Sequence, residues 1–363
     1  MKTVFKNIIL SIFLVIPLLG NAQYHRQEST LYFPDLDEYK TYKCDFHIHT
    51  AFSDGQVWPD YRVTEAIMDG LDVIAITDHI EYTPHEDYLN CDHNSSFEIA
   101  KQEGERHGVL VIKGAEITRS MPPGHLNAIF IQDANKLDTE DVMDAVAEAH
   151  NQGGFIFWNH PCWDAQQPDT VIWFDIHTEM YNNDYIDGIE VVNFSDFCPE
   201  AWAWAKEKDL TILSNSDIHS TTQMSKFVKH RPITLVFAKD LTESDIRNGL
   251  EDKRTALFYN ECIYGDEELI SQLLIKSLLI EKRYDKENNK IFFDIHNISS
   301  APIILIPSDN TPKYAIPKRL YIGAKSNIHF YVNTKDIDTR SITLKVENFF
   351  TGTDEELDFN LDL

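Results

Sequence analysis

The sequence predicts an α/β protein that ends in a small all-β region, and three observations support this fold class. Apolar runs alternate with amphipathic helical stretches over residues 42–260, the runs near the middle are unbroken Val, Ile, Leu or Phe, and polar residues directly follow many of them. Unbroken apolar strands are typical of parallel sheets that are covered on both faces. Repeated βα units therefore favour a largely parallel sheet, either closed into a barrel or open.

Seven short apolar runs are the predicted strands of this part, and they cover residues 43–46, 73–77, 109–113, 126–131, 155–158, 189–192 and 211–213. The predicted helices cover residues 61–68, 95–107, 139–152, 199–208 and 242–251. A last helix and strand are expected within residues 241–259. Thr139 and Thr242 are the expected N-cap residues, because a Thr side chain accepts hydrogen bonds from free N–H groups and acidic residues follow in the first turn.

After about Glu267 helical periodicity is missing, and apolar and polar residues alternate with a period of two, as in strands with one buried face. These runs cover residues 279–282, 290–295, 327–332, 341–346 and 357–361, with a polar turn over residues 284–289. We therefore predict a small antiparallel β-sandwich in residues 266–363. Its role is structural support, a wall of the pocket, or binding of glycan or protein at the cell surface, and we favour structural support. The α/β part is expected to cover residues 42–265, and an N-terminal extension residues 23–41.

The charge of the chain excludes some partners. Its 363 residues are 43% hydrophobic, and 32 basic against 59 acidic residues give a formal net charge of −27. Such a charge repels phosphate backbones and anionic lipid surfaces at long range, so we expect no binding to polymeric nucleic acid. A small anionic substrate stays compatible with this charge, because bound divalent ions dominate the field around them.

The first residues have the features of a secretory signal peptide over residues 1–22. Lys2 and Lys6 precede an apolar run over residues 8–19, and Gly20-Asn21-Ala22 provides a cleavage site before Gln23. We therefore expect an exported protein, periplasmic or extracellular. No Cys follows the small residues to accept a lipid anchor, and no later stretch reaches the roughly 20 apolar residues of a membrane-spanning helix.

The cysteines are few and scattered: Cys44, Cys91, Cys162, Cys198 and Cys262. They do not form the pattern of a disulfide framework. An exported chain allows one or two disulfides among them and leaves at least one thiol unpaired.

Histidines and carboxylates occur in short clusters along the α/β part, and they are ligands that zinc, manganese and iron accept. The candidate metal ligands are His47, His49, Asp54, His79, Glu116, His125, His160, Asp217 and His219. Because such ligands come from distant positions, we predict a metal site with more than one ion, enclosed from several sides.

The positions of these residues favour a barrel over an open sheet. His79, Glu116, His160 and Asp217 each follow the end of a predicted strand. In a barrel the C-terminal strand ends converge on one rim, so ligands far apart in the sequence can meet there. An open doubly wound sheet usually carries a Gly-rich phosphate loop, and the sequence contains no such loop.

The same segments resemble the polymerase and histidinol phosphatase (PHP) family. Asp45-Phe-His47-Ile-His49-Thr50-Ala-Phe-Ser53-Asp54-Gly55 is similar to its opening motif, and Ile76-Thr77-Asp78-His79 to its second motif. The remaining segments follow in the order of the family: Gly114-Ala-Glu116, His125, Asn159-His160-Pro161 and Ser216-Asp217-Ile-His219. The resemblance covers roughly residues 42–260.

The resemblance implies a distorted (β/α)7 barrel with two or three divalent ions (zinc, manganese or iron) at its C-terminal rim. It implies three groups of ligands: His47, His49, Glu116 and Asp217 for a first ion; Asp54, His79 and His219 for a second; and Glu116, His125 and His160 for a third. Glu116 would then bridge two ions. Asp78 either binds an ion or orients a neighbouring ligand.

This family resemblance implies a phosphoesterase, either a phosphatase or a phosphodiesterase, for a small phosphorylated metabolite. A metal-activated hydroxide would attack phosphorus while the ions neutralise the phosphate oxygens. Glu116 and Asp217 would hold the ions of the reaction centre, and Arg119 is the candidate phosphate clamp. Other candidates for binding an anion are Lys226, Lys229, His230 and Arg231. A metal-dependent amide or lactone hydrolase and a non-catalytic metal-binding module are the alternative functions.

Several further residues have two readings. Trp158 and Trp163 flank His160 and either wall a substrate pocket or pack in the core. Glu190 ends another strand and either faces the pocket or supports a ligand. The histidines outside the clusters, His177 among them, are expected at the surface or at helix caps.

Overall fold

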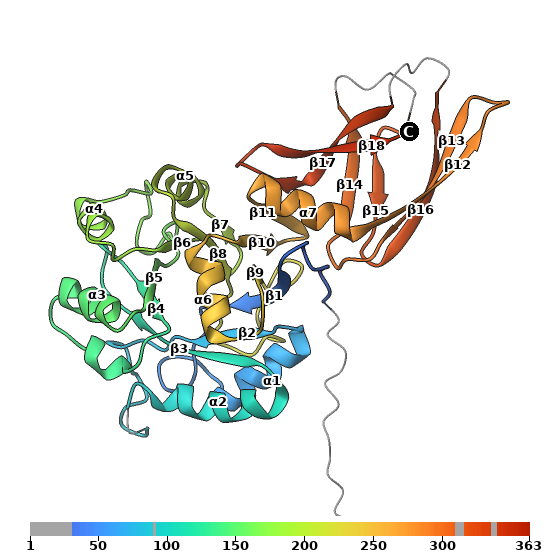
Figure 1. Ribbon diagram of the computed structural model, residues 1–363. Helices are drawn as coiled ribbons and strands as arrows, with labels where there is room; N and C mark the ends of the chain where they lie inside the picture. Colours follow the sequence, from blue (N-terminus) through green and yellow to red (C-terminus); the bar gives the residue numbers. More distant parts are fainter. Residues whose placement is uncertain (1–30, 90–91, 309–315, 335–339) are drawn as a thin grey trace, which may run out of the picture.

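The structure is a computed structural model that describes residues 31–89, 92–308, 316–334 and 340–363. The expected signal peptide over residues 1–22 and Cys91 lie outside these residues. Within them, no helix combines the length and the apolar character that crossing a membrane requires. Figure 1 shows an α/β part, with helices around its strands, and a β-rich C-terminal part beside it.

The sheet of the α/β part is mixed rather than largely parallel as the repeated βα units predicted. Strands β1 (Lys40–Asp45), β2 (Val73–Ile76) and β3 (Leu110–Ile117) are parallel, as are β5 (Phe155–Trp158), β6 (Gly188–Asn193) and β8 (Thr211–Asn215). Strand β4 (Leu126–Ile129) runs antiparallel between β3 and β5, and β9 (Ile233–Ala238) runs antiparallel to β1. The link of residues 118–125 is shorter than a parallel crossover requires, so β4 must reverse direction.

The backbone ladder does not close the α/β part into a ring. Strand β8 pairs with β6, and no ladder joins β8 to β1 or β9 within the residues that the structure describes. Two kinds of contact cross this gap. The Thr234 hydroxyl accepts from the Ser214 N–H at 2.8 Å and donates to the Ser214 carbonyl. Beyond the strand ends, the His49 N–H donates to the Ile218 carbonyl at 3.1 Å and the Asp217 N–H to the His47 carbonyl at 2.9 Å. An isolated bridge joins Ile48 to Ile218. The closed (β/α)7 barrel therefore stays a prediction.

Six helices surround these strands (Figure 1): α1 (Pro59–Asp69), α2 (Ser95–His107), α3 (Val142–Asn151), α4 (Asp175–Asn182), α5 (Pro199–Lys208) and α6 (Glu243–Glu251). The predicted cap Thr242 is confirmed, since its side chain accepts from the Asp245 N–H. The predicted cap Thr139 is wrong: Asp141 caps α3 because its carboxylate reaches the Met143 N–H, and the Thr139 hydroxyl donates to the Asp141 carbonyl instead. Helix α4 and strand β9 were not predicted.

The C-terminal part begins with a helix that the sequence analysis missed, α7 (Glu267–Ser277), so the inferred loss of helical periodicity after Glu267 is wrong. The Asp266 carboxylate caps it by accepting from the Glu268 and Leu269 N–H groups. All five predicted strands of this part are present, as β12 (Leu278–Asp285), β13 (Lys290–Asn297), β16 (Ser326–Asn333), β17 (Ser341–Phe350) and β18 (Glu356–Asp362). Two shorter strands were not predicted, β14 (Ile303–Pro307) and β15 (Leu320–Ile322).

These strands form two layers that share one apolar core. Strands β12, β13 and β16 make one antiparallel sheet, and β14, β15, β17 and β18 make the other. The second sheet continues into the α/β part, because β17 pairs in parallel with β11 (Cys262–Gly265), which pairs with β10 (Thr255–Tyr259). A single cluster of buried side chains runs through both parts, from Phe33 to Leu361. The predicted division at residues 265 and 266 stays a prediction.

His177 is buried and uses both ring nitrogens. Nδ1 accepts from the Phe174 N–H at 3.1 Å, Nε2 donates to the Pro123 carbonyl at 2.7 Å, and the ring stacks on Trp158. It therefore caps α4, one of the two roles expected for it. Burial without a carboxylate partner lowers the pKa of His177 from 6.5 to about 4.

His177→Gln should weaken the acid sensitivity of the fold. The native pKa lies below the unfolded one, so the unfolded chain takes up a proton as the pH falls from 6.5 to about 4, and stability is lost over that range. Protonation of His177 should lower the free energy of unfolding of wild type by up to about 3 kcal/mol. Urea unfolding at several pH values checks it, with a variant of the exposed His85, His85→Gln, as control. If the free energy of unfolding changed equally with pH in His177→Gln and wild type, the lowered pKa of His177 would be contradicted.

Candidate metal centre

All nine candidate ligands meet at one cavity or directly beneath it. The cavity has a volume of about 750 Å³ and lies where β2, β3, β5, β6 and β8 end. Seven candidates line it: Asp54, His79, Glu116, His125, His160, Asp217 and His219. His47 and His49 are buried below them. The structure thus brings together residues from segments that are far apart in the sequence, which Figure 1 distinguishes by colour.

The deepest group consists of His47, His49, Glu116 and Asp217. The two His Nε2 atoms lie 3.1 Å apart, and Glu116 Oε2 lies 3.2 Å from each of them. Asp217 Oδ1 lies 3.2 Å from His47 Nε2 and 3.1 Å from His49 Nε2. Donor atoms bound at about 2.0 Å to one tetrahedral ion lie about 3.3 Å apart, so these spacings suit a shared divalent ion.

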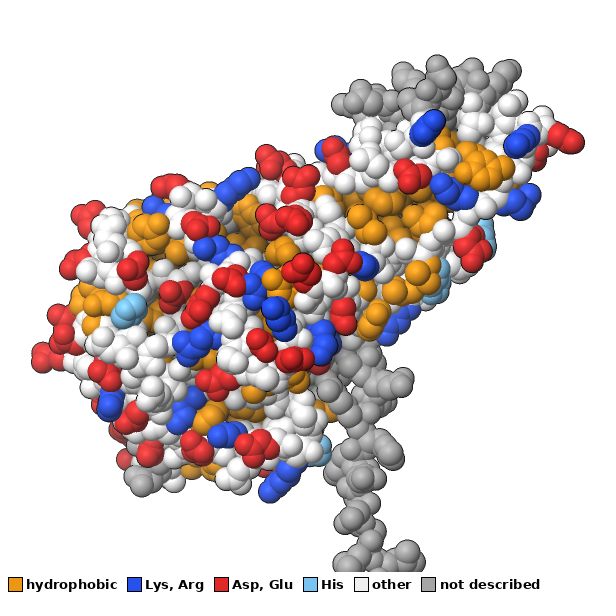
Figure 2. Space-filling view, in the orientation of Figure 1, with side chains coloured by type: hydrophobic (Ala, Val, Ile, Leu, Met, Phe, Trp, Pro, Cys, Tyr) orange, Lys and Arg blue, Asp and Glu red, His pale blue; other side chains and the backbone are white. Residues whose placement is uncertain are grey.

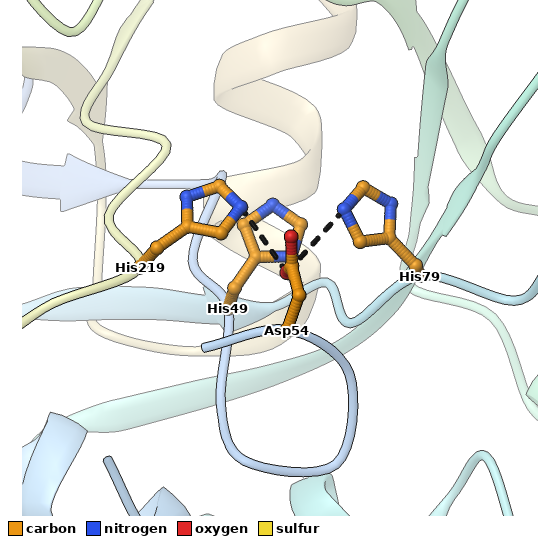
Figure 3. Close-up of side chains that lie close together, drawn as sticks. All are labelled: His49, Asp54, His79 and His219. Carbon is orange, nitrogen blue, oxygen red and sulfur yellow. Dashed lines mark ion pairs between the residues drawn. The ribbon is translucent and has the colours of Figure 1, made fainter. Parts of the chain in front are cut away.

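A second group is centred on Asp54. Figure 3 shows the Asp54 carboxylate between His219 and His79, with His49 behind it. Asp54 Oδ1 lies 3.2 Å from His219 Nε2, 3.5 Å from His79 Nε2 and 3.8 Å from His49 Nδ1. This oxygen is buried, and no described residue gives it a hydrogen bond. A buried carboxylate oxygen facing three imidazoles fits a cation that completes the site.

Glu116 joins the groups because its two oxygens face different histidines. Oε2 faces His47 and His49, whereas Oε1 lies 2.8 Å from His125 Nδ1 and 3.7 Å from His160 Nε2. The Asn159 amide donates to Oε1 at 3.0 Å. This is the orientation that a bridging carboxylate requires. His79 Nδ1 also approaches Oε2, at 3.1 Å, although its nearer partner is the Thr118 hydroxyl at 2.6 Å.

The site has strongly coupled charges. Burial alone would lower the pKa of His49, but hydrogen bonds to Asp217 and Glu116 raise it to about 9. Burial opposes ionisation of Glu116 and Asp217, yet the surrounding histidines hold the pKa of each carboxyl well below its ordinary value. Protons on His47 and His49, whose pKa values are both raised, would therefore compensate these carboxylates. Ion binding must displace these protons, so affinity should rise with pH.

Glu190 lies behind the candidate ligands rather than in the cavity. Its Oε1 accepts from His47 Nδ1 at 2.9 Å, which leaves Nε2 of His47 facing Glu116 and Asp217. Its Oε2 accepts from the backbone N–H of His160 at 2.8 Å. A carboxylate in this position sets the tautomer and orientation of a metal-binding His, the supporting role that was one of its two readings.

Asp78 holds the loop that carries Asp54. Its carboxylate accepts from the Thr50 N–H at 2.6 Å, the Thr50 hydroxyl at 2.7 Å and the Ser53 hydroxyl at 2.6 Å. The loop turns so tightly at Gly55 that a Cβ atom there would lie 2.7 Å from backbone atoms of His49 and Thr50. Asp78 therefore orients a neighbouring ligand segment.

Arg62, which the sequence analysis missed, ties two ligand segments together. Its buried guanidinium donates to the carbonyls of His49 at 2.8 Å, Ile218 at 3.0 Å and His219 at 2.8 Å. Glu65 pairs with it at 2.6 Å. The sequence carried no signal for this role, because Arg62 lies on helix α1 and reaches residues more than 150 positions away.

The structure does not place Arg119 in the cavity, contrary to its predicted role as a phosphate clamp. Its guanidinium contacts Glu81 and donates to the carbonyls of Thr118 and Thr139. These acceptors hold it away from the candidate ligands. Lys226 lines the cavity instead.

The other basic candidates are engaged elsewhere. Lys229 pairs with Glu261, Arg231 is buried in ion pairs with Asp45 and Asp69, and the His230 ring stacks on Phe258. Of the two tryptophans beside His160, Trp163 lines the cavity and Trp158 is packed in the core. Cys162 and Cys198 form a disulfide, whereas Cys44 and Cys262 are free thiols.

Comparison with known proteins agrees with this arrangement. Residues 45–229 match the PHP domain family. A crystal structure of a two-domain protein from Bacteroides vulgatus, described as containing a predicted PHP-like metal-dependent phosphoesterase, is 39% identical. The similarity covers 92% of this chain and 98% of that one, with a TM-score of 0.87. An uncharacterized protein from Methanocaldococcus jannaschii is 36% identical over 83 residues, which are 22% of this chain and only 35% of that protein.

Glu116→Ala should reduce bound metal by more than one ion per chain, because both of its oxygens face candidate ligands. Elemental analysis of the purified protein measures this. Glu103→Ala, which removes a carboxylate paired with Arg106 and His107 on helix α2, is the matched control and should leave the metal content unchanged. Equal metal content in Glu116→Ala and wild type would rule out the bridging position.

Proposed function

This chain belongs to the PHP domain family, and we propose that it is a metal-dependent phosphoesterase that hydrolyses a small phosphorylated metabolite. The observation that carries the proposal is the position of Glu116, whose two oxygens face separate sets of imidazole nitrogens in one cavity. A carboxylate shared in this way suits two neighbouring divalent ions.

The residues present fit such ions. The site contains six imidazoles and three carboxylates. Seven of these residues form groups whose ligand atoms lie within 4.8 Å of one another. The other two are Asp217, 3.2 Å from His47 Nε2, and His160, 3.7 Å from Glu116 Oε1. The buried atoms Asp54 Oδ1 and His160 Nδ1 have no hydrogen-bond partner among the described residues. Zinc, manganese or iron would satisfy this donor set. Bound ions would activate a water molecule as the nucleophile and neutralise the phosphate.

The chain's own residues position the groups that the reaction needs. Glu190 orients His47, and Arg62 fixes the backbone carbonyls of His49 and His219. Lys226, exposed at the cavity wall, is the cation available to the substrate phosphate. Because these groups are held by buried hydrogen bonds, little reorganisation is needed when a substrate binds.

The charge of the ligand set bears on the number of ions and on the substrate. Asp54, Glu116 and Asp217 carry three negative charges, so two divalent ions would leave a net charge of about +1 and three about +3. Together with a hydroxide nucleophile, a phosphate monoester brings about −2.5 to −3 charges near neutral pH, which three ions would balance better than two. We therefore propose three ions and a monoester substrate.

We also propose that the protein is exported. The disulfide between Cys162 and Cys198 supports this, because such bonds persist in oxidising compartments. Acidic side chains are spread over the face shown in Figure 2, and together with the formal charge of −27 they argue against a nucleic-acid polymer as the substrate.

Phosphate release from small esters should depend on bound ions. Dialysis against a chelator should abolish hydrolysis of a chromogenic phosphate monoester, and Mn²⁺ or Zn²⁺ should restore it, because the ions supply the nucleophile and the charge. A panel of amides and lactones is assayed in parallel. Turnover of that panel without phosphate release would favour an amide or lactone hydrolase, and metal content without any turnover would favour a non-catalytic module.

Lys226→Ala should raise KM by about 3- to 10-fold with little change in kcat. The reason is that losing a contact that holds substrate and transition state equally raises KM alone. Arg119→Ala should change KM by less than about twofold, since its guanidinium is bound to Glu81 and two carbonyls outside the cavity. Steady-state kinetics on one monoester compares the two variants. A larger increase in KM for Arg119→Ala than for Lys226→Ala would support Arg119 as the phosphate-binding residue.

A further inference from the structure

Beyond the candidate ligands, the cavity has an aromatic wall, which we define as Trp163 and Phe194. Trp163 packs directly on the metal centre: its ring centroid lies 5.1 Å from that of His160 and 5.8 Å from that of His125, at interplanar angles of 77° and 62°. It is nevertheless 44% exposed. A ring that touches two candidate ligands and still faces the cavity lies beside the position of the substrate phosphate.

Phe194 has the same unusual backbone as two of the candidate ligands. His160 follows β5, Phe194 follows β6 and Asp217 lies two residues after β8, and their φ angles are 31°, 51° and 49°. Residues other than glycine adopt this left-handed region uncommonly, and at Phe194 it belongs to the two-residue hairpin turn that follows β6. All three residues line one cavity, and Phe194 lies there just beyond the end of β6, as His160 and Asp217 lie beyond the ends of β5 and β8.

The disulfide joins the two segments that carry the aromatic wall. Cys162 is adjacent to Trp163, and Cys198 follows the β6–β7 hairpin in which Phe194 turns the chain before β7 (Asp196–Phe197). The Cys198 N–H also donates to the Val191 carbonyl at 2.8 Å. The wall is therefore held in place before a ligand arrives, which lowers the entropic cost of binding.

Few charges complete the lining. Apart from the candidate ligands, the charged side chains among the described residues that line the cavity are Lys226 and Asp196. Tyr82 and Met224 add further apolar surface. Neutral polar side chains also line the cavity, namely Gln56, Thr118, Asn193, Ser220 and Ser225. The rings of Trp163 and Phe194 would cover a planar ring.

From these observations we infer that the aromatic wall binds a planar ring close to the phosphate, so that the substrates are phosphate esters of aromatic or arylmethyl alcohols. The inference rests on the proposed phosphoesterase function and names its substrate class. The Cys162–Cys198 disulfide sets the position of the two rings.

Binding of phosphonates that cannot be hydrolysed tests the inference without reference to turnover. Isothermal titration of the metal-loaded protein compares benzylphosphonate with cyclohexylmethylphosphonate, which has the same carbon skeleton but is not planar, and with 2,3-dihydroxypropylphosphonate. Benzylphosphonate should bind about 3- to 10-fold more tightly than the cyclohexyl compound, as expected for one aromatic contact. Its advantage over the dihydroxypropyl compound should be larger.

Variants compared at equal metal content show which residues produce the preference for benzylphosphonate. Trp163→Ala and Phe194→Ala should each reduce the preference for benzylphosphonate about 3-fold or more, and Trp163→Phe should retain most of it. Phe194→Ala keeps a Cβ and hence the same backbone strain. Tyr321→Ala, which removes an exposed aromatic ring from β15, is the control and should not change the preference. The disulfide is removed in the double variant Cys162→Ser/Cys198→Ser rather than by a thiol reductant, because such reductants bind metals. This double variant should show a weaker preference for benzylphosphonate.

Equal or undetectable binding of the three phosphonates by wild type would overturn the inference, as would an unchanged preference in both alanine variants. An unchanged preference in the double cysteine variant would remove the role given to the disulfide. If the preference is found but no phosphate ester is hydrolysed, the ring-binding wall stands and the phosphoesterase function fails. If esters are hydrolysed without any ring preference, the function stands and the inference fails.

Discussion

The buried carboxylate of Glu116 imposes the constraint on which the cavity depends. A charge at this depth is stable only when it is compensated, and histidines from four segments, including His79, approach its two oxygens. Each of those histidines must in turn be held against the others, since several imidazoles in one place repel when protonated. The residues around the site supply this restraint.

Three buried polar side chains illustrate the restraint. Glu190 binds His47, and Asp78 binds the loop that carries Asp54. Arg62 joins the carbonyls of His49 and His219, so a single guanidinium spans the first and last ligand segments. None of the three lines the cavity. They show that the geometry of such a centre is set by hydrogen bonds from behind it, and a positively charged group can help to build a site for cations by binding backbone oxygens.

The C-terminal part is joined to this framework by a sheet rather than by a loose linker. Strand β17 pairs with β11 at Ile263 and Tyr264, and the Tyr264 ring stacks on Phe350. Tyr264 also lies 4.9 Å from Phe197, in the hairpin that follows the cavity. This chain of contacts connects the β-rich part with the hairpin that carries Phe194, and the structural support expected of the β-rich part stays a prediction.

The sequence by itself determined the α/β class, most strand positions and the set of polar residues that lie at strand ends, because periodicity and the residue after an apolar run are local properties. Helices α2 and α5 were predicted with their observed bounds. Only the tertiary structure decided that β4 is antiparallel, that Cys162 pairs with Cys198, and that Lys226 rather than Arg119 lines the cavity. Those outcomes depend on partners distant in the sequence, such as the Thr139 carbonyl that accepts from Arg119 and the carbonyls that Arg62 binds, and no local pattern encodes such partners.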